Sequence, residues 1–201
     1  KAWVCNTLIT SSNLVVASVS FNPSGLKLFL IYMIRVQMPE MEINIMKILI
    51  FTTRQLCYNS GYYFAHKIGE ELEKLGIECD YCEIPEYAIP SAGTQIAQPA
   101  IENAGKSVDE EAEKMLESYI GKEYLAILDF NSKLPRLVLD DESYYLDSID
   151  APFYNFILDH PLYHHSTLDC KLKNYYAFSI DENHCKYIQN FYPHIKAVYQ
   201  V

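Results

Sequence analysis

Apolar and polar residues alternate along the chain in blocks that predict strands and helices in turn. Residues 47–53 form a short apolar run of the kind buried on both faces of a parallel sheet. Between Phe64 and Leu75 the apolar positions recur with helical spacing, and Gly76 supplies a stop signal. On the outer face we expect Glu70 to pair with Lys74 at i,i+4 spacing. A second apolar run follows at residues 77–83. The order strand, helix, strand predicts a βαβ unit with a right-handed crossover.

The same alternation continues to the end of the chain. We expect further strands at residues 124–130, 153–158, 175–180 and 195–201, with a short one at 136–140. We expect a helix at residues 107–121 that opens with a capping box at 107–110, and a helix at 182–192 that Asp181 can cap. We also expect a helical turn at 141–148 and a helix that starts at Pro161. Strands and helices alternating at this spacing predict an α/β fold, with a Rossmann-like, doubly wound parallel sheet.

Residues 1–45 differ in character from the rest. Two apolar stretches, at 14–21 and 26–36, flank a turn signal at 22–25, which suits a hairpin. The longer stretch is well below the roughly 20 apolar residues that cross a bilayer, so we expect no integral membrane segment. Met46 followed directly by an apolar strand resembles a protein start. We therefore expect a domain at residues 46–201, preceded by an N-terminal extension that is either non-native or a genuine hairpin.

The composition of the chain bears on its core, its binding partners and its redox compartment. The 201 residues are 50% hydrophobic, which is enough for one buried core. Sixteen Lys and Arg against 26 Asp and Glu give a net charge of -10, which disfavours nucleic acid as a partner. The spread of the cysteines predicts structural thiols in a reducing, cytoplasmic protein rather than a disulfide framework. The six cysteines are Cys5, Cys57, Cys79, Cys82, Cys170 and Cys185.

Ligands of open α/β sheets bind beyond the carboxyl ends of the strands, so the loops there hold the candidate residues. The first loop has neither the G-x-G-x-x-G nor the G-x-x-x-x-G-K-[ST] pattern, which disfavours a dinucleotide or triphosphate site. Its side chains could instead bind a polyhydroxylated ligand, although a capped helix beside a solvated arginine explains them equally well. The ligand-binding candidates in these loops are Thr53, Arg54, Ser60, Gly61, Asn131 and Asp181.

The most unusual segment is Asp159-His160-Pro161-Leu162-Tyr163-His164-His165. Imidazole titrates near neutral pH, and an adjacent carboxylate can fix its tautomer, so this run could supply a general base. We expect His160 to face the ligand cleft and His164 and His165 to lie mostly on the surface. We do not expect a bound metal, because His164 and His165 point in different directions.

Two segments resemble a known family. PFYNFILDHPLYHH at residues 152–165 and NYYAFSIDENHCKYIQNFYPHIKAV at 174–198 resemble the N-terminal lobe of bacterial glycosyltransferase-like proteins related to the CgeB spore-maturation protein. In that group a strand ends in a D-[DH]-P-x-x-H motif, and the next strand ends in an aspartate. The opening MKILIFTTRQLCYNSGYYFAHKIGEELEKLGIECDY is similar to the first βαβ unit of two-lobed (GT-B) glycosyltransferases.

The resemblance implies an acceptor-binding lobe whose donor-binding partner lobe lies outside these residues. The full-length protein would transfer a sugar from a nucleotide-sugar to an acceptor without a bound metal, and residues 1–201 alone would be inactive. The resemblance gives His160 the role of base or acceptor contact, with Asp159 orienting it. No cofactor is expected on this domain, and the nucleotide-sugar is expected only in the full-length protein.

Two other function classes remain open at this point. One is a non-catalytic α/β binding domain of flavodoxin-like or receiver-like type. A receiver needs an acidic pair after its first strand, where this chain has Thr52-Thr53-Arg54. The other is a metal-dependent hydrolase built on His160, His164 and His165.

Overall fold

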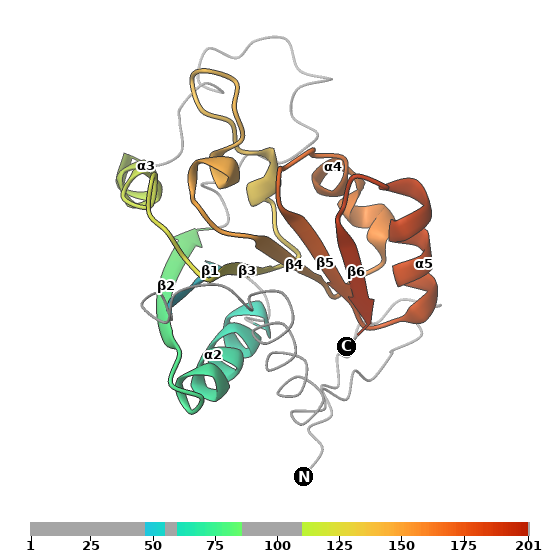
Figure 1. Ribbon diagram of the computed structural model, residues 1–201, viewed down its shortest axis with the longest axis horizontal. Coiled ribbons are helices and arrows are strands. Elements are labelled where there is room, and N and C mark those ends of the chain that lie inside the picture. The colour runs from blue at the N-terminus through green and yellow to red at the C-terminus, as the bar shows by residue number, and fades with distance from the viewer. Residues whose placement is uncertain (1–46, 55–59, 86–109, 201) are drawn as a thin grey trace, which may run out of the picture. The chain divides into compact units, whose positions relative to one another are not determined.

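The computed structural model describes residues 47–54, 60–85 and 110–200, all of which belong to one unit of the fold (Figure 1). The strands are β1 (Lys47–Arg54), β2 (Glu78–Pro85), β3 (Ala126–Phe130), β4 (Phe153–Ile157), β5 (Tyr175–Ser179) and β6 (Ala197–Gln200). The α-helices are α2 (Ser60–Glu73), α3 (Glu110–Glu117), α4 (His165–Leu168) and α5 (Glu182–Phe191). Short 3₁₀ helices occur at η2 (Leu134–Arg136), η3 (Tyr145–Ser148) and η4 (Pro161–His164).

The six strands form one parallel sheet in the order β2-β1-β3-β4-β5-β6. Helix α2 lies on one side of this sheet, and α3, α4 and α5 lie on the other (Figure 1). These features confirm the expected doubly wound α/β fold. The chain reverses its direction of travel across the sheet between β1 and β3, which places a topological switch point at their carboxyl ends.

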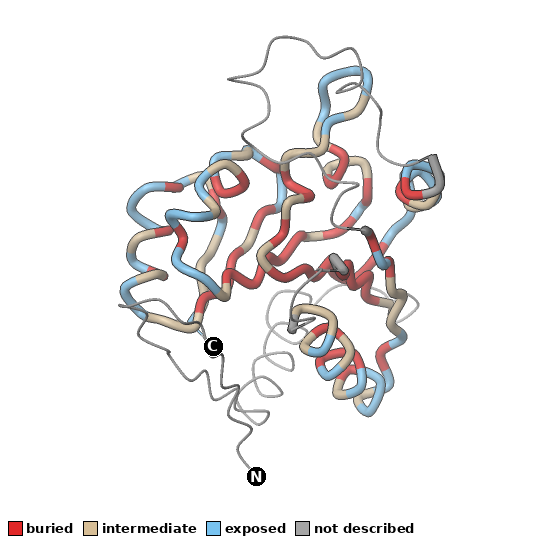
Figure 2. The backbone as a smooth tube through the Cα atoms, turned by 180° about the vertical axis from the view of Figure 1, so that it is seen from behind, coloured by how far each residue is buried: buried red, intermediate tan, exposed pale blue. Residues whose placement is uncertain are grey.

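The sheet is buried on both faces, as all-parallel sheets require. Every residue of β3 and β4 is buried, and the strands form the red centre of Figure 2. On the face of α3, α4 and α5, Leu116, Leu168 and Ile188 belong to the same apolar cluster as Phe51 and Tyr175. The opposite face carries a row of stacked rings across three neighbouring strands. That row consists of Phe130, Phe156 and Phe178, with ring centroids 4.9 and 4.5 Å apart.

Helix α2 buries the stripe that its spacing predicts. Ala65, Ile68 and Leu72 are each at most 1% exposed. Gly69 lies on the same side, where a Cβ atom would come within 1.8 Å of the Tyr81 hydroxyl oxygen on β2. The absence of a side chain at position 69 therefore permits the close approach of α2 to β2.

Two local predictions about α2 have different outcomes. Gly76 adopts a φ of 82° just after the helix, as expected of a glycine stop signal. The predicted pairing of Glu70 with Lys74 is wrong, because Lys74 pairs with Glu71 and Glu70 with Lys67, each at 2.6 Å. Both observed pairs use i,i+3 spacing, which brings side chains together on a helix surface as i,i+4 spacing does.

The predicted strand at 136–140 does not form. Residues 134–136 make the 3₁₀ helix η2, and Val138 forms only an isolated antiparallel bridge with Tyr144. Between them the Asp141 carboxylate accepts hydrogen bonds from the Ser143 N–H and hydroxyl, and Glu142 has a φ of 65°. This side-chain-stabilised turn leaves too little chain for a strand.

Several predictions lie outside the described residues. They concern the extension at 1–45, Met46, the capping box at 107–110, Cys5 and Cys57. Among the helices in the described parts of the chain, none has the length and apolar character needed to cross a membrane.

Candidate functional site

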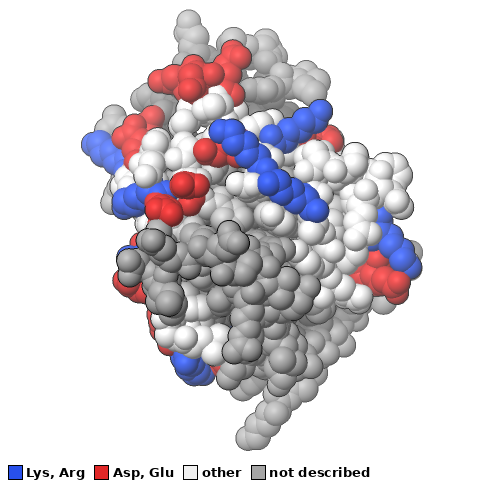
Figure 3. Space-filling view, in the orientation of Figure 1, with Lys and Arg blue, Asp and Glu red and all other residues white. Residues whose placement is uncertain are grey.

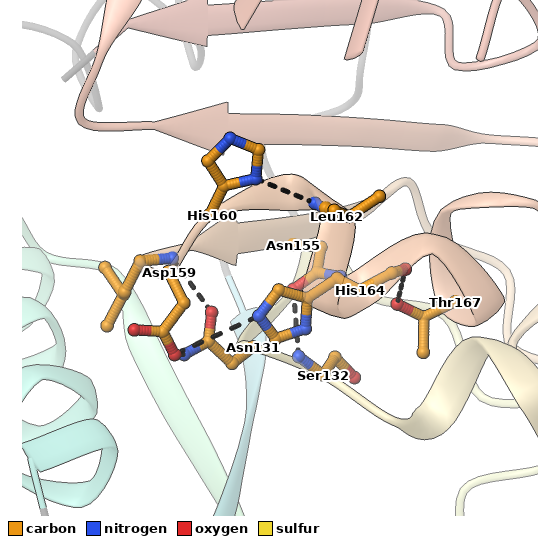
Figure 4. A network of polar contacts seen from close by, with 9 residues as sticks. Asn131, Ser132, Asn155, Asp159, His160, Leu162, His164 and Thr167 are labelled. Atoms are coloured by element: carbon orange, nitrogen blue, oxygen red, sulfur yellow. Dashed lines mark hydrogen bonds and ion pairs between the residues drawn. The ribbon is translucent and has the colours of Figure 1, made fainter. Parts of the chain in front are cut away.

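The loops after β3, β4 and β5 supply the candidate residues at the carboxyl edge of the sheet. They contribute Asn131, the pair Asp159 and His160, and Asp181 respectively. Asn131 and Asp159 come together (Figure 4). Asp181 instead has its partners within its own helix.

Asn131 fastens the end of β3 to the end of β4. It has a φ of 46°, a left-handed conformation that asparagine tolerates better than most residues. Its N–H donates to the Phe156 carbonyl at 2.8 Å, and its side-chain oxygen accepts from the Leu158 N–H at 2.9 Å. Its Nδ2 donates to Asp159 Oδ2 at 2.8 Å. Asn131 therefore shapes the loop and also orients the neighbouring carboxylate.

Asp159 has His164, and not His160, as its histidine neighbour. The Asp159 Oδ2 atom lies 4.0 Å from His164 Nε2, with the Asp159 side chain 67% exposed and the His164 side chain 14% exposed. Burial lowers the pKa of His164 below its ordinary value, although the Asp159 charge opposes this shift. The Nε2 atom of His164 is buried without a hydrogen-bond partner. The site thus places a neutral imidazole beside an exposed carboxylate.

His160 has a different local role from the one expected. It is the N-cap of η4, and its Nδ1 atom accepts a hydrogen bond from the Leu162 N–H at 3.1 Å. An accepting Nδ1 leaves the proton of a neutral imidazole on Nε2. The expected orientation of His160 by Asp159 is therefore not what the geometry provides. The His160 ring instead packs edge-on to His184, with centroids 4.7 Å apart.

The three histidines of this segment do not converge. His165 Nδ1 lies 3.6 Å from Asp169, while His160 and His164 face His184 and Asp159. In the part of the chain that the structure describes, no three His, Cys, Asp or Glu side chains are placed to hold a metal ion. The geometry therefore gives no support to a hydrolase built on His160, His164 and His165.

Asp181 has the capping role that also explained it in the sequence. Its Oδ1 atom accepts from the N–H groups of Asn183 at 2.8 Å and His184 at 3.2 Å. These N–H groups of His184 and Asn183 hold the pKa of Asp181 below its ordinary value. The pKa of His184 is lowered by burial and then by the neighbouring His160, and its Nδ1 atom is buried without a hydrogen-bond partner.

The candidates of the first loop are only partly described. Thr53 and Arg54 end β1 and Ser60 begins α2, but their side chains lie outside the described part of the structure. At Gly61 a Cβ atom would meet Phe130 at 3.8 Å, an ordinary contact, so the position has room for a side chain.

A second polar group, which the sequence did not reveal as such, lies buried behind the same edge. Asp129 is fully buried on β3, where its Oδ1 accepts from the Phe130 N–H at 2.7 Å and its Oδ2 has no partner. Burial raises the pKa of Asp129 to about 7. Nearby, Asn155 accepts from the Ser132 N–H at 3.1 Å and donates to the Tyr175 hydroxyl at 3.0 Å. The sequence could have revealed this buried group through the Asp and the Asn that interrupt otherwise apolar strands.

The described cysteines Cys79, Cys82, Cys170 and Cys185 are all free thiols. Burial raises the pKa of Cys79 and of Cys82 to about 12, and that of Cys170 to about 11. Because the thiolate is the reactive form, these residues are poor nucleophiles at neutral pH.

Comparisons with protein-family models, with curated proteins and with solved structures find no match to this chain. The residues and geometry of the carboxyl edge are therefore the basis on which we infer what the chain does.

Proposed function

We propose that residues 46–201 form the acceptor-side N-terminal domain of a glycosyltransferase, which transfers a sugar from a nucleotide-sugar donor to an acceptor. The observation that carries this proposal is the contact group of Asn131, Asp159 and His164 at the carboxyl edge of the sheet, with His160 next to Asp159 in the chain. Parallel α/β sheets bind their ligands at this edge.

The cluster offers the hydrogen-bonding groups that a hydroxylated ligand needs. Asp159 presents an exposed carboxylate that accepts hydroxyl protons, and Asn131 holds it in place. His160 has its Nδ1 atom occupied by the Leu162 N–H, so its Nε2–H is available as a donor to a sugar oxygen. In this arrangement His160 contacts the acceptor, and the Asp159 carboxylate accepts a hydrogen bond from the acceptor hydroxyl.

Charge favours an uncharged acceptor over a polyanion. On the face shown in Figure 3, cationic and anionic side chains lie side by side and do not form a broad basic patch. The chain as a whole carries a net charge of -10. A neutral sugar meets no electrostatic penalty on such a surface, whereas nucleic acid does.

The proposal includes a second lobe as a partner. That lobe would bind the nucleotide-sugar, and the cleft between the two lobes would align the reactants, as transfer between two substrates requires. The domain by itself would bind acceptor but would not turn over. We place it in the cytoplasm, where its free thiols would stay reduced.

A sugar titration followed by amide and imidazole NMR tests this proposal. Glucose, galactose and N-acetylglucosamine, with their disaccharides, are added to the isotope-labelled chain. We expect shifts at Asn131, Asp159 and His160 with at least one sugar. Saturation without shifts at this edge, or no binding by any of these sugars, would contradict the proposal.

The strand order favours one alternative, a flavodoxin-like binding domain. The order β2-β1-β3-β4-β5 with a switch point between β1 and β3 is the one that flavodoxins use to bind flavin mononucleotide. The receiver-like form is less well supported, because Asp129 at the end of β3 is fully buried. Titration with flavin mononucleotide, monitored by quenching of flavin fluorescence, separates this alternative from the transferase.

A further inference from the structure

Exposed and half-buried aromatic residues form a continuous ridge beside the proposed acceptor site. The ridge consists of Tyr163 on η4, His160 at its N-cap, and His184, Tyr187 and Phe191 on α5. The His160 ring lies 6.4 Å from Tyr163, 4.7 Å from His184 and 6.0 Å from Tyr187, and Tyr187 lies 4.6 Å from Phe191. Two separate elements thus contribute rings to one surface.

The ends of the ridge are exposed while its middle is fixed. Tyr163 is 81% exposed and Phe191 is 66% exposed, which makes them the two most exposed large apolar side chains among the described residues. His160 is held by its hydrogen bond from the Leu162 N–H. Tyr187 packs on Tyr192, which is buried, with the two ring centroids 6.2 Å apart. A platform with fixed supports loses little conformational entropy when it binds a ligand.

The ridge is small for a protein interface. Tyr163 and Phe191 are its exposed apolar side chains, and with the exposed Leu162 next to Tyr163 in the chain they offer roughly a few hundred Å², below the roughly 800 Å² that one partner contributes to a stable complex. Exposed apolar patches of this size on soluble proteins are often functional. The area fits a small ligand better than a second protein.

The groups bordering the ridge select the kind of small ligand. Asp159 directly precedes His160, Asp181 accepts from the His184 N–H, and the charge of Glu182 is paired with Lys186 at 2.7 Å. These carboxylates disfavour a phosphorylated ligand. A sugar ring has one face of C–H groups that can pack on an aromatic ring, and hydroxyls that can bond to a carboxylate and an imidazole at its edge.

We infer that Tyr163 and Phe191 are the stacking positions of an extended saccharide site, in which sugar units pack on the ridge while the reacting unit lies at Asp159 and His160. This inference rests on the proposed function, and it assigns a neutral oligosaccharide rather than a single sugar as the acceptor class. The ridge follows α5 from His184 to Phe191, about 10 Å at 1.5 Å per residue, which is longer than one sugar ring needs.

Variants of three exposed aromatic residues test the inference in the whole chain. Tyr163→Ala and Phe191→Ala each remove a ring of the ridge. Tyr63→Ala removes a 52% exposed ring from α2, on the other side of the sheet, and serves as the matched control. Binding of a disaccharide and its monosaccharide is measured by NMR titration, and melting temperatures confirm that all variants are folded.

We expect the disaccharide to bind the wild-type chain more tightly than the monosaccharide does. Each ridge variant should weaken disaccharide binding roughly five- to tenfold, as loss of one aromatic contact does, while Tyr63→Ala leaves it unchanged. Sugar binding at Asn131 and Asp159 that neither ridge variant alters would overturn the inference and leave the proposed function standing. Failure of the wild-type chain to bind any sugar would overturn both. A dimer in light scattering that Tyr163→Ala converts to monomer would show a self-association surface and would overturn the inference.

Discussion

Two groups of polar residues lie at the same edge of the sheet, one buried and one exposed. Asp129, Ser132 and Asn155 are at most 1% exposed, whereas the Asp159 side chain is 67% exposed. The Asn155 amide accepts a hydrogen bond from the Ser132 N–H and donates one to the Tyr175 hydroxyl. Asn131, by contrast, presents an oriented carboxylate to solvent through its bond to Asp159. Similar side chains are therefore enclosed by the fold in one group and available to a ligand in the other.

The largest expected effect on the free energy of unfolding is at Asp129, in the buried group. Its pKa of about 7 in the folded protein exceeds the value of about 4 of an unfolded aspartate. The folded state therefore holds a proton that the unfolded chain has lost, so stability is fully present below about pH 4 and falls as pH rises to about 7. Three pKa units correspond to about 4 kcal/mol.

Asp129→Asn removes this titration and keeps an acceptor for the Phe130 N–H. Urea unfolding at several pH values should show the wild type losing up to about 4 kcal/mol relative to the variant between pH 4 and 8. Parallel stability curves for the two proteins would mean that the Asp129 carboxyl is solvated. They would contradict the distinction between a buried and an exposed polar group.

The second effect concerns Asn155. Asn155→Ala leaves the Ser132 N–H and the Tyr175 hydroxyl without their partner in the interior and should lower the free energy of unfolding by about 2–4 kcal/mol. Tyr175→Phe removes only one of these bonds and should cost about 1 kcal/mol. Chemical denaturation of the two single variants and the double variant gives the coupling energy, and strict additivity would contradict the observed bond between the two side chains.

The smallest effect on stability is expected at the exposed group. Asp159→Asn should change the free energy of unfolding by less than about 0.5 kcal/mol, because the side chain is largely in solvent. It should lower the pKa of His164 further, since the Asp159 charge is what raises it against burial. Imidazole NMR titration of wild type and variant measures this shift. An unchanged His164 titration would place the two groups too far apart to interact.

Much of the fold followed from local pattern. Apolar runs at 47–53, 153–158 and 175–180 correspond to β1, β4 and β5, because strands buried on both faces need continuous hydrophobicity. Asp181 and Gly76 marked helix ends, since capping is chemistry within a few residues. The predicted strand at 136–140 failed because the Asp141–Ser143 turn competed with it.

The candidate site followed from the sequence only in outline. The pattern located Asp159 and His160 at a strand end but paired the wrong histidine with the carboxylate. Pro161 begins a 3₁₀ helix, and that turn brings His164 back toward Asp159. The bond from Asn131 joins two loops that are distant in sequence, so no local pattern encodes it.

The strand order also bears on how the chain is made. Ile48 in β1 pairs with Ala126 in β3, so β1 gains its second neighbour only after the intervening segment has left the ribosome. Until then β1, in which Ile48, Leu49, Ile50 and Phe51 are all buried in the finished sheet, has an open side, and pairing between segments so distant in sequence is slow. Assembly of the sheet during synthesis should therefore pause with β1 and β2 paired, and the remaining strands should join once β3 has emerged.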